Sequence, residues 1–116
     1  MDIQDRALDF ACEIVMLHQE LMRRRGAARH LAGQLLRSGT SVGSNLEEAD
    51  AGQSRADFIS KCRVSLKEAR ESLYWLKLLH RSKLGPQERT ESLVQEADEI
   101  VSILTVIIRK AAASRA

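Results

Sequence analysis

Apolar residues recur at steps of three and four along almost the whole chain, a spacing typical of helices that bury one face. The clearest repeat is the last one: Leu93, Ala97, Ile100, Leu104, Ile107 and Ala111. One proline and six glycines in 116 residues leave little room for the turns of a β fold. The sequence therefore predicts an all-α protein, with helices over about residues 3–24, 27–51, 54–80 and 87–112.

The connections between these helices are short, which predicts an antiparallel up-down-up-down four-helix bundle over residues 1–116 as one domain. Gly26 follows three arginines, a typical helix end, and Ser54 with Asp57 forms an N-cap pattern before the third helix. Gly85 and Pro86 mark the last connection. The predicted core consists of Phe10, Ile14, Leu17, Leu35, Val42, Leu46, Phe58, Leu66, Leu73, Leu93, Ile100 and Leu104.

The stretch from Leu35 to Ala49 contains two glycines, Gly39 and Gly43. Each interior glycine costs a helix about 1 kcal/mol relative to alanine. Apolar residues nevertheless continue through the stretch at helical spacing, and its small side chains would let a neighbouring helix approach closely. We therefore expect this segment to be the inner helix of the bundle, and a leucine at position 39 to destabilise it by overpacking.

The formal charge of +2 is too small to indicate nucleic-acid binding by itself, but the charges are unevenly placed. In the predicted topology, the first and last connections lie at the same end of the bundle. The candidate nucleic-acid-binding residues are the basic side chains of that end: Arg23, Arg24, Arg25, Arg29, Lys77, Arg81 and Lys83. The alternative interpretation is that these side chains only complement the negative C-terminal ends of helices.

No pattern for catalysis, for a cofactor or for a metal occurs in the sequence. His18, His30 and His80 lie on different segments, and Cys12 and Cys62 lack the spacing of a zinc site. No apolar run reaches the roughly 20 residues of a membrane span, and the N-terminus lacks a signal-peptide pattern. We expect a cytoplasmic protein with no enzyme activity, no cofactor and no membrane contact.

Two further apolar rows, spaced by seven residues, flank the buried faces of the first and last helices: Leu8, Val15 and Met22, and Val94, Val101 and Ile108. Such faces are wider than one bundle requires, which predicts a homo-oligomer. Tyr74 and Trp75 are neighbours on one helix, so they cannot both face the core. A ring outside the core indicates a subunit interface, or else Trp75 simply covers the connection that follows the third helix.

Three blocks on the second and third helices form a specific motif. They are Arg37-Ser38-Gly39-Thr40-Ser41-Val42-Gly43-Ser44-Asn45 with Glu48, then Arg55-Ala56-Asp57-Phe58-Ile59-Ser60-Lys61, and Leu66-Lys67-Glu68-Ala69 with Glu71, Tyr74, Trp75 and Leu76. This motif resembles the bacterial four-helix bundle family whose founding members are encoded in intervening sequences of the 23S rRNA gene. Many relatives carry Ile-Pro-Ala in place of Val42-Gly43-Ser44, which predicts a less kinked second helix in this chain.

The resemblance implies a cyclic homopentamer with a central channel, no known enzyme activity, and contact with nucleic acid. Relatives that assist diversity-generating reverse transcriptases bind both a polymerase and nucleic acid. Two functions therefore remain open for this chain. The first is a nucleic-acid-binding accessory protein, for RNA or DNA, that uses a basic rim. The second is a scaffold that docks a partner polypeptide, such as a reverse transcriptase, without touching nucleic acid.

The motif residues are expected to be structural: Arg37, Ser41, Asn45, Glu48, Lys61 and Glu71. Folding the second helix back on the third places Arg37 beside Glu68 or Glu71, and Glu48 beside Lys61. Ser41 and Asn45 are expected to hydrogen-bond across to the third helix, because buried polar groups need partners.

Overall fold

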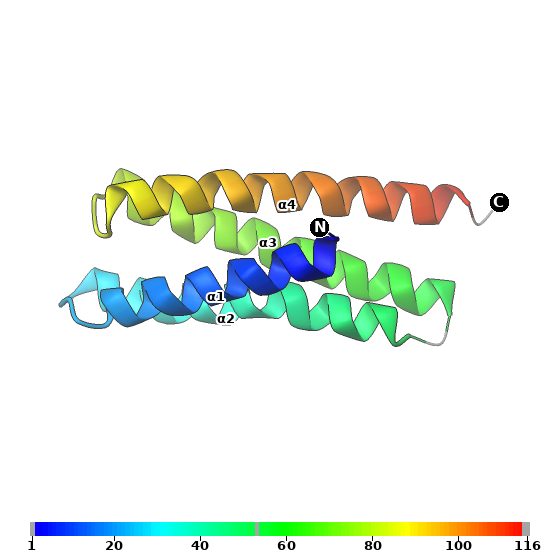
Figure 1. The fold of residues 1–116 in the computed structure, drawn as a ribbon, viewed down its shortest axis with the longest axis horizontal. Helices are drawn as coiled ribbons and strands as arrows, with labels where there is room; N and C mark the ends of the chain where they lie inside the picture. The colour runs from blue at the N-terminus through cyan, green and yellow to red at the C-terminus, as the bar shows by residue number, and fades with distance from the viewer. Residues whose placement is uncertain (1, 53, 115–116) are drawn as a thin grey trace.

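The computed structural model describes residues 2–52 and 54–114, which form four helices. They are α1 (Ile3–Leu21), α2 (Ala27–Asp50), α3 (Arg55–Arg81) and α4 (Gln87–Ala113). The helices run alternately up and down in a bundle of 51 × 22 × 20 Å (Figure 1). This arrangement confirms the predicted all-α antiparallel four-helix bundle. The second helix packs on α1 and α3, whereas α1 and α4 contact each other least.

Local capping signals set where the helices begin. The Asp2 carboxylate accepts a hydrogen bond from the Asp5 N–H (2.8 Å), and the Ser54 hydroxyl accepts one from the Asp57 N–H (3.1 Å). α1 ends at Leu21, three residues before the predicted end. The chain tightens there into a turn, in which the Arg24 N–H donates to the Leu21 carbonyl (3.0 Å).

α3 ends in a turn whose left-handed residue is Lys83 (φ 56°). The Leu84 N–H donates to the Leu79 carbonyl, and the Lys83 N–H donates to the His80 carbonyl, the hydrogen-bond pattern of a Schellman motif. Glycine normally occupies this position, because a side chain in the left-handed region costs about 1–2 kcal/mol. The connection to α4 is therefore strained at a basic residue.

α2 is one continuous helix through both glycines, as predicted. A Cβ atom added at Gly39 would lie 2.9 Å from both Cγ1 and Cγ2 of Ile14, whose side chain on α1 is fully buried. The stretch that contains Gly39 therefore brings the backbone of α2 directly against α1. The packing gained at this close approach offsets the poor helix propensity of glycine.

Most of the predicted core residues are buried: Phe10, Ile14, Leu17, Leu35, Val42, Leu46, Leu93, Ile100 and Leu104. The prediction is wrong for Phe58, Leu66 and Leu73, which are half-buried at the edge of the core. The residues that α3 buries instead are Ile59, Cys62, Ser65, Ala69, Ser72, Leu76 and Leu79. Burial also raises the pKa of the Cys62 thiol.

Small polar side chains explain why α3 turns a different face inward. The hydroxyls of Ser38 and Ser72 are hydrogen-bonded across the α2–α3 interface (2.9 Å), and the Ser65 hydroxyl donates to the Val42 carbonyl (2.7 Å). All three serines are fully buried. Serine lets the two backbones approach more closely than leucine would, so the larger side chains of α3 lie beside the contact and not within it.

We predict that Gly39→Leu lowers the free energy of unfolding by about 2 kcal/mol or more, because the new side chain overlaps Ile14 in a packed core. Ile14 is branched at Cβ and buried, so it has no free space to move into. Chemical denaturation measures the change.

Gly33→Leu is the matched control, since Gly33 lies on the exposed side of the same helix and nothing lies within 4 Å of an added Cβ atom. This variant should keep its stability or gain up to about 1 kcal/mol from helix propensity. Equal losses at positions 33 and 39 would contradict the close approach.

Candidate nucleic-acid interface

The α1–α2 and α3–α4 connections meet at one end of the bundle, as the sequence predicted (Figure 1). The guanidinium of Arg24 donates a hydrogen bond to the Leu84 carbonyl (2.9 Å), which links the two connections directly. Arg24 also lies 3.7 Å from the Glu20 carboxylate. This arginine therefore has a structural role at the end of the bundle, which we call the basic end.

All seven predicted nucleic-acid-binding side chains are exposed: Arg23, Arg24, Arg25, Arg29, Lys77, Arg81 and Lys83. Within residues 2–52 and 54–114, only Arg24 among them has an ion pair or a side-chain hydrogen bond. The other six keep their charges directed to solvent and accessible to an anion. The structure thus brings the predicted set together at one end.

The helix macrodipole accounts for only part of this set. Arg81 lies in the last turn of α3, where a cation is favourable. Arg29 instead lies in the first turn of α2, where the helix dipole disfavours a positive charge. That turn contains no acidic residue, and its N-cap, Gly26, offers no side-chain hydrogen bond. Arg23 and Arg25 follow the C-terminal end of α1, where a cation is favourable, so Arg29 is the residue that needs another explanation.

The motif residue Arg37 joins α2 to α3, as predicted. Its guanidinium donates to the carboxylates of Glu68 (3.2 Å) and Glu71. Glu71 also accepts a hydrogen bond from the Trp75 ring N–H (3.0 Å). The Trp75 N–H and the Arg37 guanidinium hold the pKa of the Glu71 carboxyl below its ordinary value, and the bond to Glu71 likewise raises the pKa of Arg37.

The other predicted motif contacts are wrong. Ser41 donates to the Arg37 carbonyl (2.7 Å), and the Asn45 side chain donates to the Ser41 carbonyl (2.8 Å), so both bonds stay within α2. Glu48 and Lys61 are exposed, and no ion pair joins them in the described part of the chain. Asn45 is seven residues from Ser38 and lies on the same face of α2, but the hydrogen bond of its amide goes to its own helix.

Sequence reasoning missed the serines that do cross between the helices. The available signal was that Ser65 and Ser72 are spaced by seven residues on α3, the same spacing as an apolar core row. Serines at that spacing indicate a close helix contact when the facing helix also carries small residues. Ser38, beside Gly39 on α2, provides that match.

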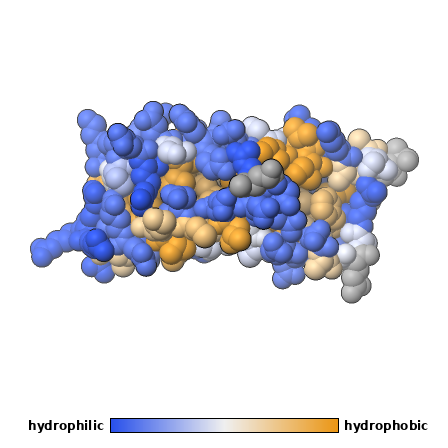
Figure 2. Space-filling model, in the orientation of Figure 1, coloured by the Kyte–Doolittle hydropathy of each residue, from blue (hydrophilic) through white to orange (hydrophobic). Residues whose placement is uncertain are grey.

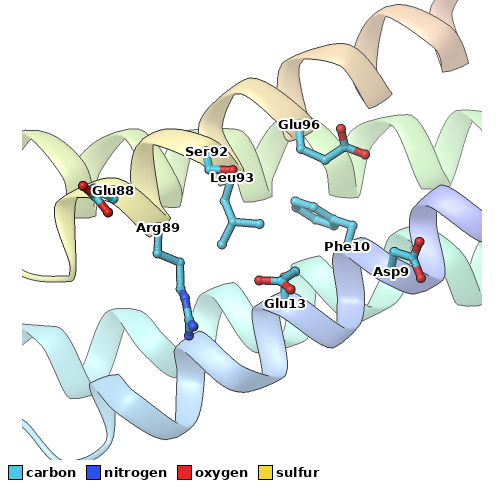
Figure 3. Close-up of a pocket in the computed structure, with 8 residues that line it drawn as sticks. All are labelled: Asp9, Phe10, Glu13, Glu88, Arg89, Ser92, Leu93 and Glu96. Carbon is cyan, nitrogen blue, oxygen red and sulfur yellow. The ribbon is translucent and has the colours of Figure 1, made fainter.

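α1 and α4 diverge toward the basic end, and a hollow of about 530 Å³ lies between them (Figures 1 and 3). Its polar lining contains four carboxylates and one guanidinium: Asp9, Glu13, Glu88, Glu96 and Arg89. Phe10 and Leu93, which point into the space between the helices, are almost fully buried. This excess of negative charge repels phosphate, so the hollow is not part of a nucleic-acid interface. The sequence analysis did not identify it.

Glu96, which lines this hollow, also forms an ion pair between α1 and α4. The Arg6 guanidinium binds the Glu96 carboxylate at 2.6 Å and lies 3.7 Å from Glu99, and the bond to Glu96 raises the pKa of Arg6. Despite the number of carboxylates, the described residues contain no group of three His, Cys, Asp or Glu side chains placed to hold a metal ion. Nor is any of their helices both long enough and apolar enough to span a bilayer.

The two apolar rows that we expected outside the core differ in their exposure. On α1, Leu8 is 62% exposed and Val15 is 40% exposed, but the third predicted member, Met22, is half-buried against the core. Met16, which was not predicted, is exposed beside Val15. On α4, Ile108 belongs to the core, and Val94 and Val101 pack against it, so the prediction of a spare row there is wrong. Figure 2 shows apolar surface over α1 and over the C-terminal half of α4, where Val106 is exposed.

The comparisons with known proteins agree with the fold. The family model described as 23S rRNA-intervening sequence protein matches residues 1–106. The chain belongs to this family. A crystal structure of a protein of unknown function from the S23 ribosomal protein family of Bacteroides thetaiotaomicron is 42% identical, with a TM-score of 0.84. The match covers 92% of this chain and 98% of that protein. No curated protein matched the chain.

We predict that Glu71→Gln reduces the acid sensitivity of the fold. The lowered pKa means that ionised Glu71 stabilises the folded state above its ordinary pKa of about 4.5. This contribution is lost as the pH falls through the lower pKa that Glu71 has in the folded state. The unaltered protein should therefore lose more stability than the variant on acidification below pH 5. At pH 7 the variant should be less stable by about 1 kcal/mol or less, because the pair is partly solvated.

Thermal unfolding at several pH values measures this difference. Glu91→Gln serves as the control, because Glu91 is exposed and has no ion pair among the described residues. Identical pH profiles for Glu71→Gln and the unaltered protein would contradict the assignment.

Proposed function

We propose that the protein is a non-enzymatic accessory protein that binds nucleic acid through phosphates at its basic end. The observation that carries the proposal is the cluster of Arg23, Arg25 and Arg29 around the start of α2. Arg29 is unfavourable for α2 itself, because it lies in the first turn of that helix, whereas a phosphate would be attracted by the three guanidinium groups and by the uncapped N–H groups together. An anionic ligand therefore explains this arrangement better than helix stabilisation does.

The surrounding charge supports the same ligand. No aspartate or glutamate occurs between Leu21 and Leu46, and Lys77 and Arg81 add positive charge from the end of α3. Basic side chains of this kind contact the phosphate backbone and not the base edges. Binding should accordingly have little sequence preference and should weaken steeply with salt.

The proposal includes a homo-oligomer, with a pentamer as the number implied by the family resemblance. The exposed row of Leu8, Val15 and Met16 on α1 supplies an apolar surface that a single bundle leaves in water. A ring that buries this row would carry one basic end per subunit. Several modest phosphate contacts would then act together on one nucleic-acid strand.

The first prediction from this proposal concerns the ligand. Labelled RNA and DNA oligonucleotides should bind with salt-sensitive fluorescence anisotropy, and Arg23→Gln/Arg25→Gln should weaken binding at least tenfold, since two phosphate contacts are lost in each subunit. Arg24 stays intact in this variant because it links the two connections.

Lys61→Gln/Lys110→Gln removes the same charge from exposed residues away from the basic end and should bind as the unaltered protein does. Failure to bind at low salt, or equal binding by both double variants, would overturn the proposal. The result would then favour a scaffold that docks a partner polypeptide, such as a reverse transcriptase.

The second prediction concerns assembly. Light scattering of the unaltered protein at micromolar concentration should give a multiple of the chain mass, with five expected. Leu8→Glu/Val15→Glu should shift the protein to monomers without unfolding it, because both side chains are exposed in the single bundle. Val106→Glu adds one negative charge at an exposed apolar position of α4 and should leave the mass unchanged. A monomeric unaltered protein would contradict the proposed ring.

A further inference from the structure

Five basic side chains form a row along the outer face of α3. We call this set, with the tyrosine at its centre, the α3 row: Arg63, Lys67, Arg70, Tyr74, Lys77 and Arg81. Successive members are three or four residues apart, so they lie on one helix face, opposite the buried positions. All are exposed, and Tyr74 is 59% exposed. From position 63 to position 81 the row is about 27 Å long.

The charges of the α3 row are largely uncompensated, although Lys67 lies close enough to Glu71 to contribute to the lowered pKa of that carboxyl. Among residues 2–52 and 54–114, none of the five cations of the row has an ion pair or a side-chain hydrogen bond. The acids nearest to it on α3, Glu68 and Glu71, are instead bound by Arg37. An ordinary solvated helix face alternates charges of both signs. This face presents one sign only.

The surface beside the row is also hollowed. A hollow of about 270 Å³ is lined by Arg63, Leu66, Lys67 and Arg70. A second hollow of about 220 Å³ shares Arg63 and Leu66 and adds Arg109 from α4. No acidic residue lines either one, in contrast to the carboxylate-rich hollow between α1 and α4. Cations beside an apolar floor attract an anion more strongly than fully solvated cations do.

Tyr74 gives the row a second chemical feature. Its ring lies edge to face with the ring of Trp75, with the centroids 5.2 Å apart at an angle of 72°. Trp75 is in turn fixed by its hydrogen bond to Glu71. The tyrosine ring is therefore supported on one side while most of its surface stays in water. An exposed aromatic ring among cations is the combination found in sites for single-stranded nucleic acid, because every base has a face that can stack.

We propose that a single strand of nucleic acid runs along the α3 row, with phosphates on its cations and one base stacked on Tyr74. This inference rests on the proposed function and extends it, because Lys77 and Arg81 belong both to the basic end and to the row. A duplex would offer its phosphates to the same cations but no base face to the tyrosine. The row thus favours single strands over duplexes.

The test measures the binding of a labelled oligothymidine against salt concentration. Lys67→Gln/Arg70→Gln should lower the slope of log K against log salt by about 1.4, since each phosphate contact on a single strand contributes about 0.7. Tyr74→Ala should weaken binding about five- to hundredfold with the slope unchanged, because stacking releases no counterions. Tyr74→Phe keeps the ring face and should bind like the unaltered protein.

Lys61→Gln/Lys110→Gln is the control with matched charge, and its salt slope should not change. If Arg23→Gln/Arg25→Gln weakens binding while Lys67→Gln/Arg70→Gln leaves the slope unchanged, the α3 row is not a contact and the proposed function stands. If the unaltered protein does not bind oligothymidine at low salt but binds RNA or duplex DNA, only the inference about the α3 row is overturned, whereas failure to bind any of them overturns both proposals.

Three further outcomes also contradict the inference. The first is that Tyr74→Ala binds as tightly as the unaltered protein. The second is that a duplex of equal length binds more tightly than the single strand. The third is that Lys67→Gln/Arg70→Gln changes the mass measured by light scattering. In that case the row contacts a second copy of the chain, whose carboxylate-rich hollow between α1 and α4 would be its partner.

Discussion

The close approach of α2 to both of its neighbours is the constraint on which the rest of the bundle depends. On one side, Ile14 of α1 packs against the backbone at Gly39. On the other side, Ser38 and Ser72 form a buried hydrogen bond between α2 and α3. Both contacts need small side chains at adjacent positions of α2, and each would be disrupted if its own position carried a large residue. The glycine that weakens α2 as an isolated helix is thus required by its packing.

This packing also determines where the charged residues lie. Because the small residues fix how α2 and α3 face each other, Arg37 reaches Glu68 and Glu71 at the edge of their contact. Arg37 thereby binds Glu68 and Glu71 on the side of α3 toward α2, and the outer face of α3 keeps only cations. α1 and α4 diverge toward the basic end and leave a hollow lined by carboxylates. Charge of opposite sign therefore collects on different surfaces of a nearly neutral molecule.

This separation of charge bears directly on function. In the proposed function, a nucleic acid would be attracted to the basic end and repelled by the hollow between α1 and α4, which would give it a defined orientation. The exposed apolar side chains of α1 lie on a further surface, where the proposed subunits would pack without covering the basic end. Assembly and anion binding would then involve different helices.

The sequence by itself determined the number of helices, their topology and the basic end, because helical periodicity, capping residues and short connections are local properties. It also identified Gly39 and Arg37 correctly. Only the tertiary structure decided which face of α3 is buried. The apolar pattern of α3 favours burial of Leu66 and Leu73, but the contact with α2 is made by Ser65 and Ser72. The hydrogen bonds of these serines form only because Val42 and Ser38 lie opposite them. The α3 row and the carboxylate-rich hollow were likewise decided by that rotation and by the spacing between helices, which no single segment of sequence specifies.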